Sequence, residues 1–198
     1  MRQMKIRDPS DKPKNHTTMD KTKPLFIHVP KTSGRYIKSV VETKLNYFIH
    51  RPANNIKQSC NFYDDIESFA IIRNPYDRFV SAFNFNPQNK NADINEFVFN
   101  VHDNPMDFYA RFGPHREHFN TQTYFLTDDN DNIIVKKLFR YENLQECYDW
   151  LNEKLQVSLQ VKDHNSHWED VLTAESITYL TVLYRRDFAM LGYLPTLT

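Results

Sequence analysis

Short apolar runs alternate with amphipathic helical patterns along this chain. The runs at 25–29, 46–50, 69–72 and 133–139 each have about the length of one strand. Between them, apolar residues recur every three or four positions, as they do on one face of a helix. Alternating strands and helices predict an α/β domain, in which helices cover both faces of a central, mostly parallel sheet.

Capping residues and prolines mark the helix boundaries. Asn74 followed by Pro75 predicts a helix start directly after the third apolar run. Asp93 with Glu96 is typical of a capping box, and a second Asn-Pro pair predicts a helix over 104–112. Three apolar stripes predict the remaining helices: Ile37, Val40, Val41 and Leu45; Leu144, Cys147, Tyr148, Leu151 and Leu155; and Ile177, Leu180, Tyr184 and Phe188, in a helix that begins after Thr173 and ends before Gly192.

The size and charge of the chain limit the alternatives. A length of 198 residues favours one domain, and the Lys, Asp and Pro of residues 1–22 predict a flexible tail before a domain at 23–198. The 25 Lys and Arg balance the 25 Asp and Glu, so the general basic field that nucleic-acid binding uses is not expected. Cys60 and Cys147 form no CxxC pair and are expected to be free thiols. No stretch is apolar enough for a signal peptide or a membrane span.

The first strand-to-helix turn, PKTSGRY at 30–36, carries groups suited to an anion. Lys31 supplies a cation, Thr32 and Ser33 supply hydroxyls, and Gly34 lets the backbone approach a ligand closely. The turn matches neither the GxxxxGK[ST] loop nor the GxGxxG turn. It therefore predicts a phosphate or sulfate site, and the alternative is an ordinary tight turn with a solvated lysine.

The second turn of this kind follows the third apolar run. Arg73 ends the strand and Ser81 lies on the helix that follows, so a guanidinium and a hydroxyl can meet at one phosphate. The alternative interpretation is an arginine that caps the helix and a serine that packs against its neighbours.

Together the two segments have a family resemblance. FIHVPKTSG at 26–34 and IIRNPYDRFVSAF at 71–83 resemble the 5'-phosphosulfate loop and the 3'-phosphate segment of sulfotransferases that use 3'-phosphoadenosine-5'-phosphosulfate (PAPS), particularly the carbohydrate-type group. HFNTQTYFL at 118–126, LFRYENL at 138–144 and LYRRDFAMLGY at 183–193 are also similar to segments of that family, so the resemblance covers residue 23 to about 194. It implies a three-layer, P-loop-like domain that transfers the sulfuryl group of PAPS to a hydroxyl acceptor on a carbohydrate.

The resemblance also implies roles for individual residues. Lys31 is expected to stabilise the bridging oxygen of the leaving group, and Arg73 with Ser81 to hold the 3'-phosphate. The residues expected around the 5'-phosphosulfate are Thr32, Ser33, Gly34, Arg35 and Tyr36, with Ser166 in a loop that closes over the nucleotide. The family commonly has Gly-Gly-Thr-Ser where this chain has Ser33-Gly34-Arg35-Tyr36. Ser33 is a mild change if its φ is negative, and Arg35 supplies charge in place of the lost hydroxyls if it faces the cofactor.

The expected general base is a histidine. His50 is the first candidate, because it follows a predicted strand at a spacing from Arg73 similar to that of a catalytic histidine in some relatives. His118 is the second candidate and a Glu or Asp from the middle segment is the third, while a plain surface histidine is the alternative interpretation of His50. His28, inside the first strand, is expected to be buried and hydrogen-bonded. The pairs 115/118 and 164/167 lack a metal-binding pattern, so no metal is expected. For the loop at 164–172, the alternative to closing over the nucleotide is a solvent-exposed loop that is anchored by Trp168.

Two other functions compete with this one. The chain is alternatively a non-catalytic relative that binds PAPS or its product PAP, or a phosphotransferase with the same anion site. ATP has no 3'-phosphate for Arg73 and Ser81 to hold, which argues against the phosphotransferase. The expected partner is a hydroxyl group of a glycan, and neither nucleic acid nor a membrane is expected as a partner. A local basic cleft is expected from Arg111, Arg116, Lys136 and Lys137. The expected location is cytoplasmic or otherwise soluble, and the Golgi lumen only if an anchor has been removed.

Overall fold

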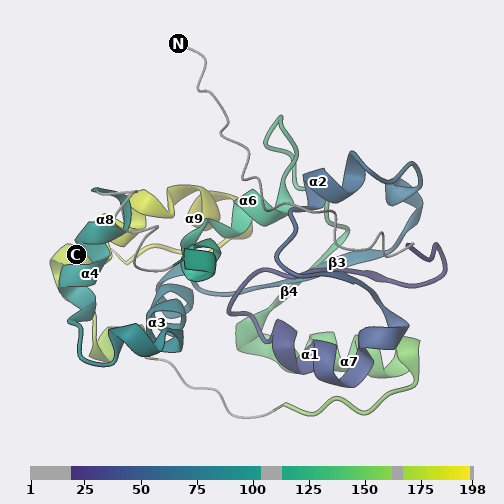
Figure 1. The fold of residues 1–198 in the computed structure, drawn as a ribbon, viewed down its shortest axis with the longest axis horizontal. Coiled ribbons are helices and arrows are strands. Elements are labelled where there is room, and N and C mark those ends of the chain that lie inside the picture. The colour runs from purple at the N-terminus through teal and green to yellow at the C-terminus, as the bar shows by residue number, and fades with distance from the viewer. Residues whose placement is uncertain (1–18, 104–112, 162–166, 197–198) are drawn as a thin grey trace.

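Four parallel strands form the sheet in the computed structural model, which describes residues 19–103, 113–161 and 167–196 (Figure 1). The strands are β1 (Leu25–Ile27), β2 (Asn46–Phe48), β3 (Ser68–Ile72) and β4 (Lys137–Arg140), in the order β2-β1-β3-β4. Phe26 lies opposite Tyr47 on one side and Phe69 on the other. The predicted α/β fold is confirmed, and every strand pair of this sheet is parallel.

Helices cover both faces of the sheet. Side chains alternate along each strand, so Phe26 and Phe69 face one apolar core while Leu25 and Ala70 face the other. The first core is covered by α1 (Gly34–Val41) and α7 (Leu144–Leu155), which lie together below the sheet in Figure 1. On the other face lie α2 (Ala53–Lys57) and α6 (Gln122–Leu126). This arrangement confirms the predicted three layers.

A group of helices extends the second core beyond the end of the sheet. It contains α3 (Pro75–Phe85), α4 (Ile94–Asp103), α8 (Ala174–Leu183) and α9 (Arg185–Leu191), on the left of Figure 1. Aromatic rings fill this part of the core: Phe79 lies 5.9 Å from Phe97, 5.4 Å from Phe119 and 6.5 Å from Tyr184 between ring centroids.

Asn74, Asp93 and Thr173 form side-chain hydrogen bonds at the predicted starts of their helices. The Asn74 side chain accepts hydrogen bonds from the backbone N–H groups of Tyr76 and Asp77, and Pro75 follows it in the first turn of α3. The carboxylate of Asp93 accepts the N–H of Asn95, and Thr173 caps α8 through the N–H of Ser176. These caps fix the points at which the chain enters each helix.

Three local predictions differ from the structure. Val40 is 40% exposed, because the stripe of α1 that faces the sheet is the narrower one of Ile37 and Val41. The fourth strand begins only at Lys137, since Ile133 forms an antiparallel bridge with Thr127 and leads the chain into the sheet. The last predicted helix is two helices that meet at Tyr184, a buried residue whose hydroxyl donates to the carbonyl of Phe119.

The division of the chain into a tail at 1–22 and a domain at 23–198 stays a prediction. Residues 1–18 lie outside the described part, as does the helix predicted over 104–112. Asp20 is joined to the sheet, because its N–H donates to the Asn46 side chain over 2.8 Å. None of the helices in the described ranges has the length and apolar character that a membrane crossing needs.

Candidate functional site

The turn after β1 has an unusual backbone. Lys31 and Ser33 both have positive φ, 70° and 68°, although neither is glycine. The first hydrogen bonds of α1 run from the N–H groups of Tyr36 and Ile37 to the carbonyl of Ser33. The backbone N–H groups from Thr32 to Arg35 therefore precede the helical hydrogen bonds, in alternating conformations of the kind that form anion-binding concavities.

Gly34 is required by its contact with a histidine ring. A Cβ at this position would lie 2.1 Å from both Cδ2 and Nε2 of His28, far inside van der Waals contact. The His28 ring is buried, and its Nδ1 lies 2.8 Å from the hydroxyl of Tyr47. His28 is thus the buried, hydrogen-bonded histidine that was predicted. The close approach of Gly34 to a ligand stays a prediction, and packing against His28 is a second reason for the glycine.

The two hydroxyls of the turn have partners within the protein. Thr32 is fully buried and its hydroxyl donates to the carbonyl of Val29 over 2.8 Å. The Ser33 hydroxyl lies 2.8 Å from the hydroxyl of Tyr148 on α7. Because its φ is positive, Ser33 does not meet the condition under which it is a mild replacement for glycine.

Lys31 and Arg35 lie on the same side of the turn. The Lys31 ammonium is 4.0 Å from the centroid of the Phe85 ring at the end of α3, and the Arg35 guanidinium is 5.7 Å from the same centroid. Burial, followed by the nearby charges of Arg73 and Arg35, lowers the pKa of Lys31 to about 8. A concentration of positive charge that lowers the pKa of a lysine favours an anion at this point.

Arg73 extends from the end of β3 toward the same turn. Its guanidinium lies 4.0 Å from the centroid of the Tyr141 ring, and its Nη1 donates to the carbonyl of Lys31 over 3.2 Å. The side chain is buried. The structure therefore brings Lys31, Arg35 and Arg73 together from two strand-to-helix turns that are far apart in the sequence.

Three histidines form a row beside these cations. The ring centroid of His50 lies 4.7 Å from that of His28 and 5.3 Å from that of His118. His118 in turn lies 5.1 Å from Phe85, the ring that Lys31 contacts. The two predicted base candidates are thus neighbours, and Phe85 connects them to the turn after β1.

His50 has a carboxylate next to it. Its Nδ1 lies 3.4 Å from Oε2 of Glu117, and its φ is positive at 47°. A hydrogen on Nδ1 that faces Glu117 leaves Nε2 as the proton acceptor. Burial, followed by His50 and His118, lowers the pKa of His28 to about 3, so His28 is neutral at neutral pH. No group of three or more His, Cys, Asp or Glu side chains in the described ranges is arranged to hold a metal ion.

The remaining predicted site residues lie in different places. Ser81 is half-buried in the second turn of α3. The Tyr36 side chain lies 5.9 Å from the ring of Tyr148, and its hydroxyl accepts the backbone N–H of Gln160, so it is turned toward α7. Ser166 lies outside the described residues.

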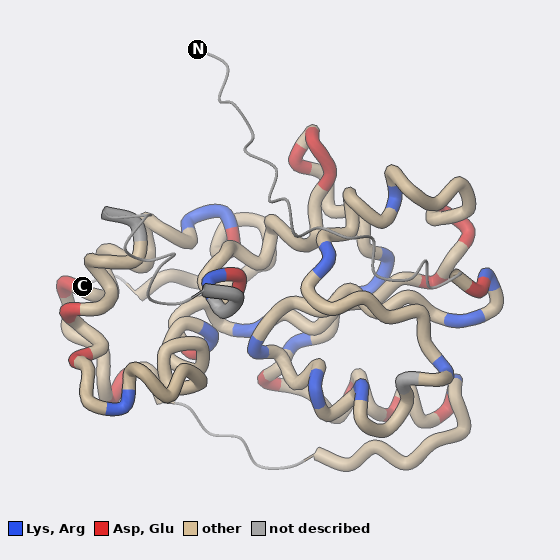
Figure 2. Tube along the Cα trace, viewed as in Figure 1, with Lys and Arg blue, Asp and Glu red and all other residues tan. Residues whose placement is uncertain are grey.

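Sequence reasoning missed several residues that surround the site. Phe85, Glu117, Gln122, Tyr141 and Tyr148 contact the predicted site residues, yet none of them was assigned a binding or catalytic role. Gln122 and Tyr141 lie inside the segments that resemble the sulfotransferases, and Glu117 directly precedes His118. Their closeness in sequence to these motifs is the signal that could have identified them as residues of the site. Over the part of the chain that the structure describes, Figure 2 shows Lys and Arg interspersed with Asp and Glu.

The structure combines a parallel α/β sheet with a turn after β1 that carries Lys31 and Arg35, and with Arg73 directly after β3, at the edge where ligands of open α/β sheets bind. A family model described as "Sulfotransferase family" matches residues 14–194, so the chain belongs to the sulfotransferase family. Neither the curated proteins nor the solved structures include a match.

Proposed function

We propose that this sulfotransferase-family protein transfers the sulfuryl group of PAPS to a hydroxyl of a carbohydrate. The observation that carries the proposal is the meeting of Lys31, Arg35 and Arg73 beside the imidazoles of His50 and His118. Cations suit the phosphosulfate, and an imidazole suits the acceptor proton. The carbohydrate acceptor is supported by the resemblance to the carbohydrate-type group.

The nucleotide would be held at both of its phosphate ends. Backbone N–H groups from Thr32 to Arg35 would surround the 5'-phosphate, since the hydroxyl proton of Thr32 is directed to Val29. Lys31 would stabilise the oxygen that leaves with PAP. Arg73 and Ser81 would hold the 3'-phosphate, and a guanidinium fixed over Tyr141 loses little freedom when it binds. Arg35, beside Lys31, would supply charge in place of the hydroxyls that relatives have.

His50 would accept the proton of the acceptor hydroxyl. With Nδ1–H directed to Glu117, the acceptor oxygen loses its proton to Nε2 as it forms the new bond to sulfur. The bond between sulfur and the bridging oxygen breaks, and PAP leaves with that electron pair beside Lys31. His118, packed edge-on against His50, is the second candidate for the same role.

A non-catalytic PAP-binding protein is the second candidate function. One observation favours it: the hydroxyls of Thr32 and Ser33 have partners inside the protein, and Ser33 holds a positive φ where relatives have glycine. Fewer donors at the 5' end would weaken PAPS binding while the 3' end stays intact.

Calorimetric titration with PAP, AMP and ATP tests the nucleotide site. We expect a preference for PAP, and a loss of PAP affinity of roughly 10- to 100-fold in Lys31→Ala and in Arg73→Ala, as charge-assisted hydrogen bonds are removed. Lys44→Ala is the matched control, because Lys44 is exposed and donates to the carbonyl of Leu155 at the end of α7. Equal affinity for PAP and AMP in the unchanged protein contradicts the proposal.

Transfer of labelled sulfate from PAPS to a panel of glycans, phenols and sterols separates the two candidate functions. Sulfated glycan supports the enzyme, and PAP binding without transfer to any acceptor supports the non-catalytic protein. In an active protein we expect His50→Ala to lower kcat by about 100-fold or more while the Kd for PAP stays unchanged. Full turnover in His50→Ala assigns the proton transfer to another residue.

A further inference from the structure

The backbone of Arg73 is held by a single buried side chain. The amide of Gln122 accepts the N–H of Arg73 through Oε1 over 2.9 Å and donates to the carbonyl of Arg73 through Nε2 over 2.7 Å. Gln122 is fully buried. The pairing of β3 with β4 ends at Ile72, so this two-bond contact, called the Gln122 clamp below, extends the ordered strand by one residue.

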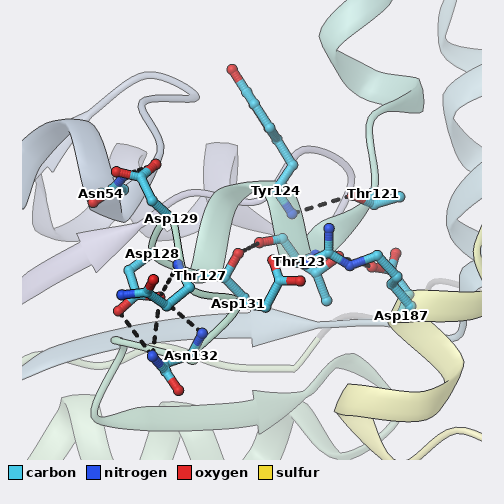
Figure 3. Close-up of polar contacts among 12 residues, drawn as sticks. Asn54, Thr121, Thr123, Tyr124, Thr127, Asp128, Asp129, Asp131, Asn132 and Asp187 are labelled. Carbon is cyan, nitrogen blue, oxygen red and sulfur yellow. Dashed lines mark hydrogen bonds and ion pairs between the residues drawn. The ribbon is translucent and has the colours of Figure 1, made fainter.

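Gln122 is held in place from the far end of the chain. It is the first residue of α6, and its N–H donates to Asp187 on α9 over 2.7 Å. The other carboxylate oxygen of Asp187 accepts the N–H and the hydroxyl of Thr123, over 2.9 and 3.0 Å. Thr121 accepts the next N–H, that of Tyr124. In Figure 3, Asp187 comes from the yellow α9 toward the start of α6.

These contacts belong to a fully buried polar group of residues. Gln122 and Asp187 have no exposed surface, and neither does Arg78, which donates to the carbonyls of His118 and Asn120 just before α6. Buried hydrogen bonds to a charged group are strong and costly to remove. The segment from His118 to Thr123 is therefore fixed at both of its ends.

The clamp determines where the Arg73 guanidinium lies. Beyond Arg73, the N–H of Asn74 donates to Glu142, and the Arg73 side chain lies over Tyr141 with its Nη1 on the carbonyl of Lys31. Tyr141 and Glu142 follow β4, so this stretch is held from the loop after the neighbouring strand as well as by Gln122 and the carbonyl of Lys31. A shift of the Arg73 backbone would move the guanidinium away from the turn that carries Lys31.

We infer that Gln122 is a positioning residue for recognition of a nucleotide 3'-phosphate, and that Asp187 acts through it. The inference rests on the proposed function, since it assumes that Arg73 contacts the 3'-phosphate. The backbone of Arg73 is held on one side by Gln122, and the guanidinium is held on the other by Tyr141. Selectivity for the 3'-phosphate then depends on a side chain that does not touch the nucleotide.

The test compares the affinities for PAP and AMP in Gln122→Met, which keeps the size of the side chain and removes both hydrogen bonds of the clamp. AMP lacks the 3'-phosphate, so the Kd for AMP divided by the Kd for PAP reports on the 3'-phosphate site that Arg73 and Ser81 would form. We expect Gln122→Met to lower this ratio by roughly 10- to 100-fold, the effect of misplacing a binding group by about 1 Å. The affinity for AMP should change by less than about threefold, which is the size of change expected when a substitution and the contacts of a ligand are independent.

Asn152→Leu is the matched control. Asn152 forms the same two-bond contact with the backbone of Leu159, through Nδ2 to the carbonyl over 3.0 Å and from the N–H to Oδ1 over 2.6 Å. It lies near the end of α7, and its two hydrogen bonds go to Leu159 and not to Arg73 or its neighbours. We expect this variant to lose stability as Gln122→Met does and to keep the PAP to AMP ratio of the unchanged protein.

Asp187→Asn provides a second route if Gln122→Met does not fold. It removes the charge that fixes α6 and leaves the clamp residue in place, so the ratio should fall in the same direction by a smaller factor. A Gln122→Met or Asp187→Asn protein that is folded and keeps the full preference for PAP overturns the inference while the proposed function stands. An unchanged protein with no preference for PAP overturns both.

Discussion

At the scale of single residues, the contact between Gly34 and His28 joins the turn after β1 to the row of histidines. Replacement by alanine places a Cβ 2.1 Å from the imidazole, so either the ring or the start of α1 must move. We expect Gly34→Ala to lower the free energy of unfolding by about 1–3 kcal/mol, as overpacking of a core does. Because His28 contacts His50, PAP affinity and turnover should fall as well.

Urea unfolding and calorimetry with PAP check this expectation, with Gly192→Ala as the control. Gly192 has a φ of 67° at the end of α9, so alanine is strained there too. The atom nearest to the added Cβ belongs to Arg140, at 3.2 Å, and no histidine atom lies within 4 Å of it. Both variants should be destabilised, and only Gly34→Ala should bind PAP more weakly. Wild-type binding in Gly34→Ala would falsify the role given to this contact.

The ammonium of Lys31 should make nucleotide binding depend on pH. Its pKa is lowered to about 8 from the usual 10.5, so the charged form predominates below pH 8 and is progressively lost above it. Bound phosphate favours the charged form. We therefore expect the affinity for PAP to fall as pH rises above 8, by up to about tenfold per pH unit, and binding at pH 8.5 to take up protons.

Calorimetry in two buffers with different ionisation enthalpies measures the protons that are taken up. Lys31→Arg is the informative variant, because the guanidinium stays charged throughout this range. Its PAP affinity should be nearly independent of pH between 8 and 9.5, without proton uptake. The same uptake in Lys31→Arg as in the unchanged protein assigns the titration to another group.

At the scale of elements, the turn between β1 and α1 depends on a hydrogen bond to α7. A positive φ at a residue other than glycine costs about 1–2 kcal/mol, and Ser33 carries this strain while bonded to Tyr148. We expect Tyr148→Phe to lower the free energy of unfolding by about 1 kcal/mol in the unchanged protein. In a Ser33→Gly background the same change should cost close to nothing, since its partner is absent.

A double-mutant cycle by urea unfolding measures this coupling. Tyr63→Phe is the matched control: Tyr63 is also a buried tyrosine, but its hydroxyl donates to the carbonyl of Ile134 on the far side of the sheet. Its cost should be the same with and without Ser33→Gly. A Tyr148→Phe cost that is equal in both backgrounds shows that the hydroxyl pair does not stabilise the turn.

The elements themselves were largely predictable from local patterns. The apolar runs became β1, β2 and β3, and Asn74-Pro75 became the start of α3, because a cap and a proline act on their own few neighbours. The break at Tyr184 was not predictable. No Gly or Pro marks this break in the sequence. It lies where the buried Tyr184 contacts Phe119 and where Asp187 contacts the start of α6, and both contacts join residues that are far apart in the chain.

The meeting of Lys31 and Arg73 at the candidate site was predictable in a similar way. Lys31 and Arg73 follow strands, and parallel strands bring their ends to one edge of the sheet. The partners that orient the site come from far along the chain: Tyr148 lies 115 positions from Ser33, and Gln122 lies 49 from Arg73. No spacing rule connects such pairs. Only the folded chain identifies Glu117 as the neighbour of His50.

At the scale of the whole molecule, the candidate site lies where the layered sheet meets the helical group. Lys31 lies in the turn after β1, and Arg73 directly follows β3. Phe85 is the last residue of α3, and His118 lies in the 3-10 helix Gly113–Phe119. His28 lies between these parts, buried and neutral, with its ring against α1. A charge on this ring therefore opposes the folded state as a whole.

Acid should destabilise the fold through His28. Its pKa is lowered to about 3 in the folded protein and is 6.5 for an ordinary histidine. Between these values the unfolded chain binds a proton that the folded protein does not, so the free energy of unfolding falls with pH below 6.5, by up to about 1.4 kcal/mol per pH unit. The contribution of His28 is complete above pH 6.5 and is lost on acidification toward pH 3.

Urea unfolding at several pH values between 7 and 4 measures this slope. His28→Gln keeps a polar partner for Tyr47 and cannot take up a proton, so the slope below pH 6.5 should flatten relative to the unchanged protein. His167→Gln is the control: His167 is exposed, and the slope should be unaffected. Carboxylates contribute equally to all three proteins and cancel in the comparison. Equal slopes in His28→Gln and the unchanged protein would mean that the imidazole accepts a proton without unfolding the core, and that His28 is open to water in the acidic range.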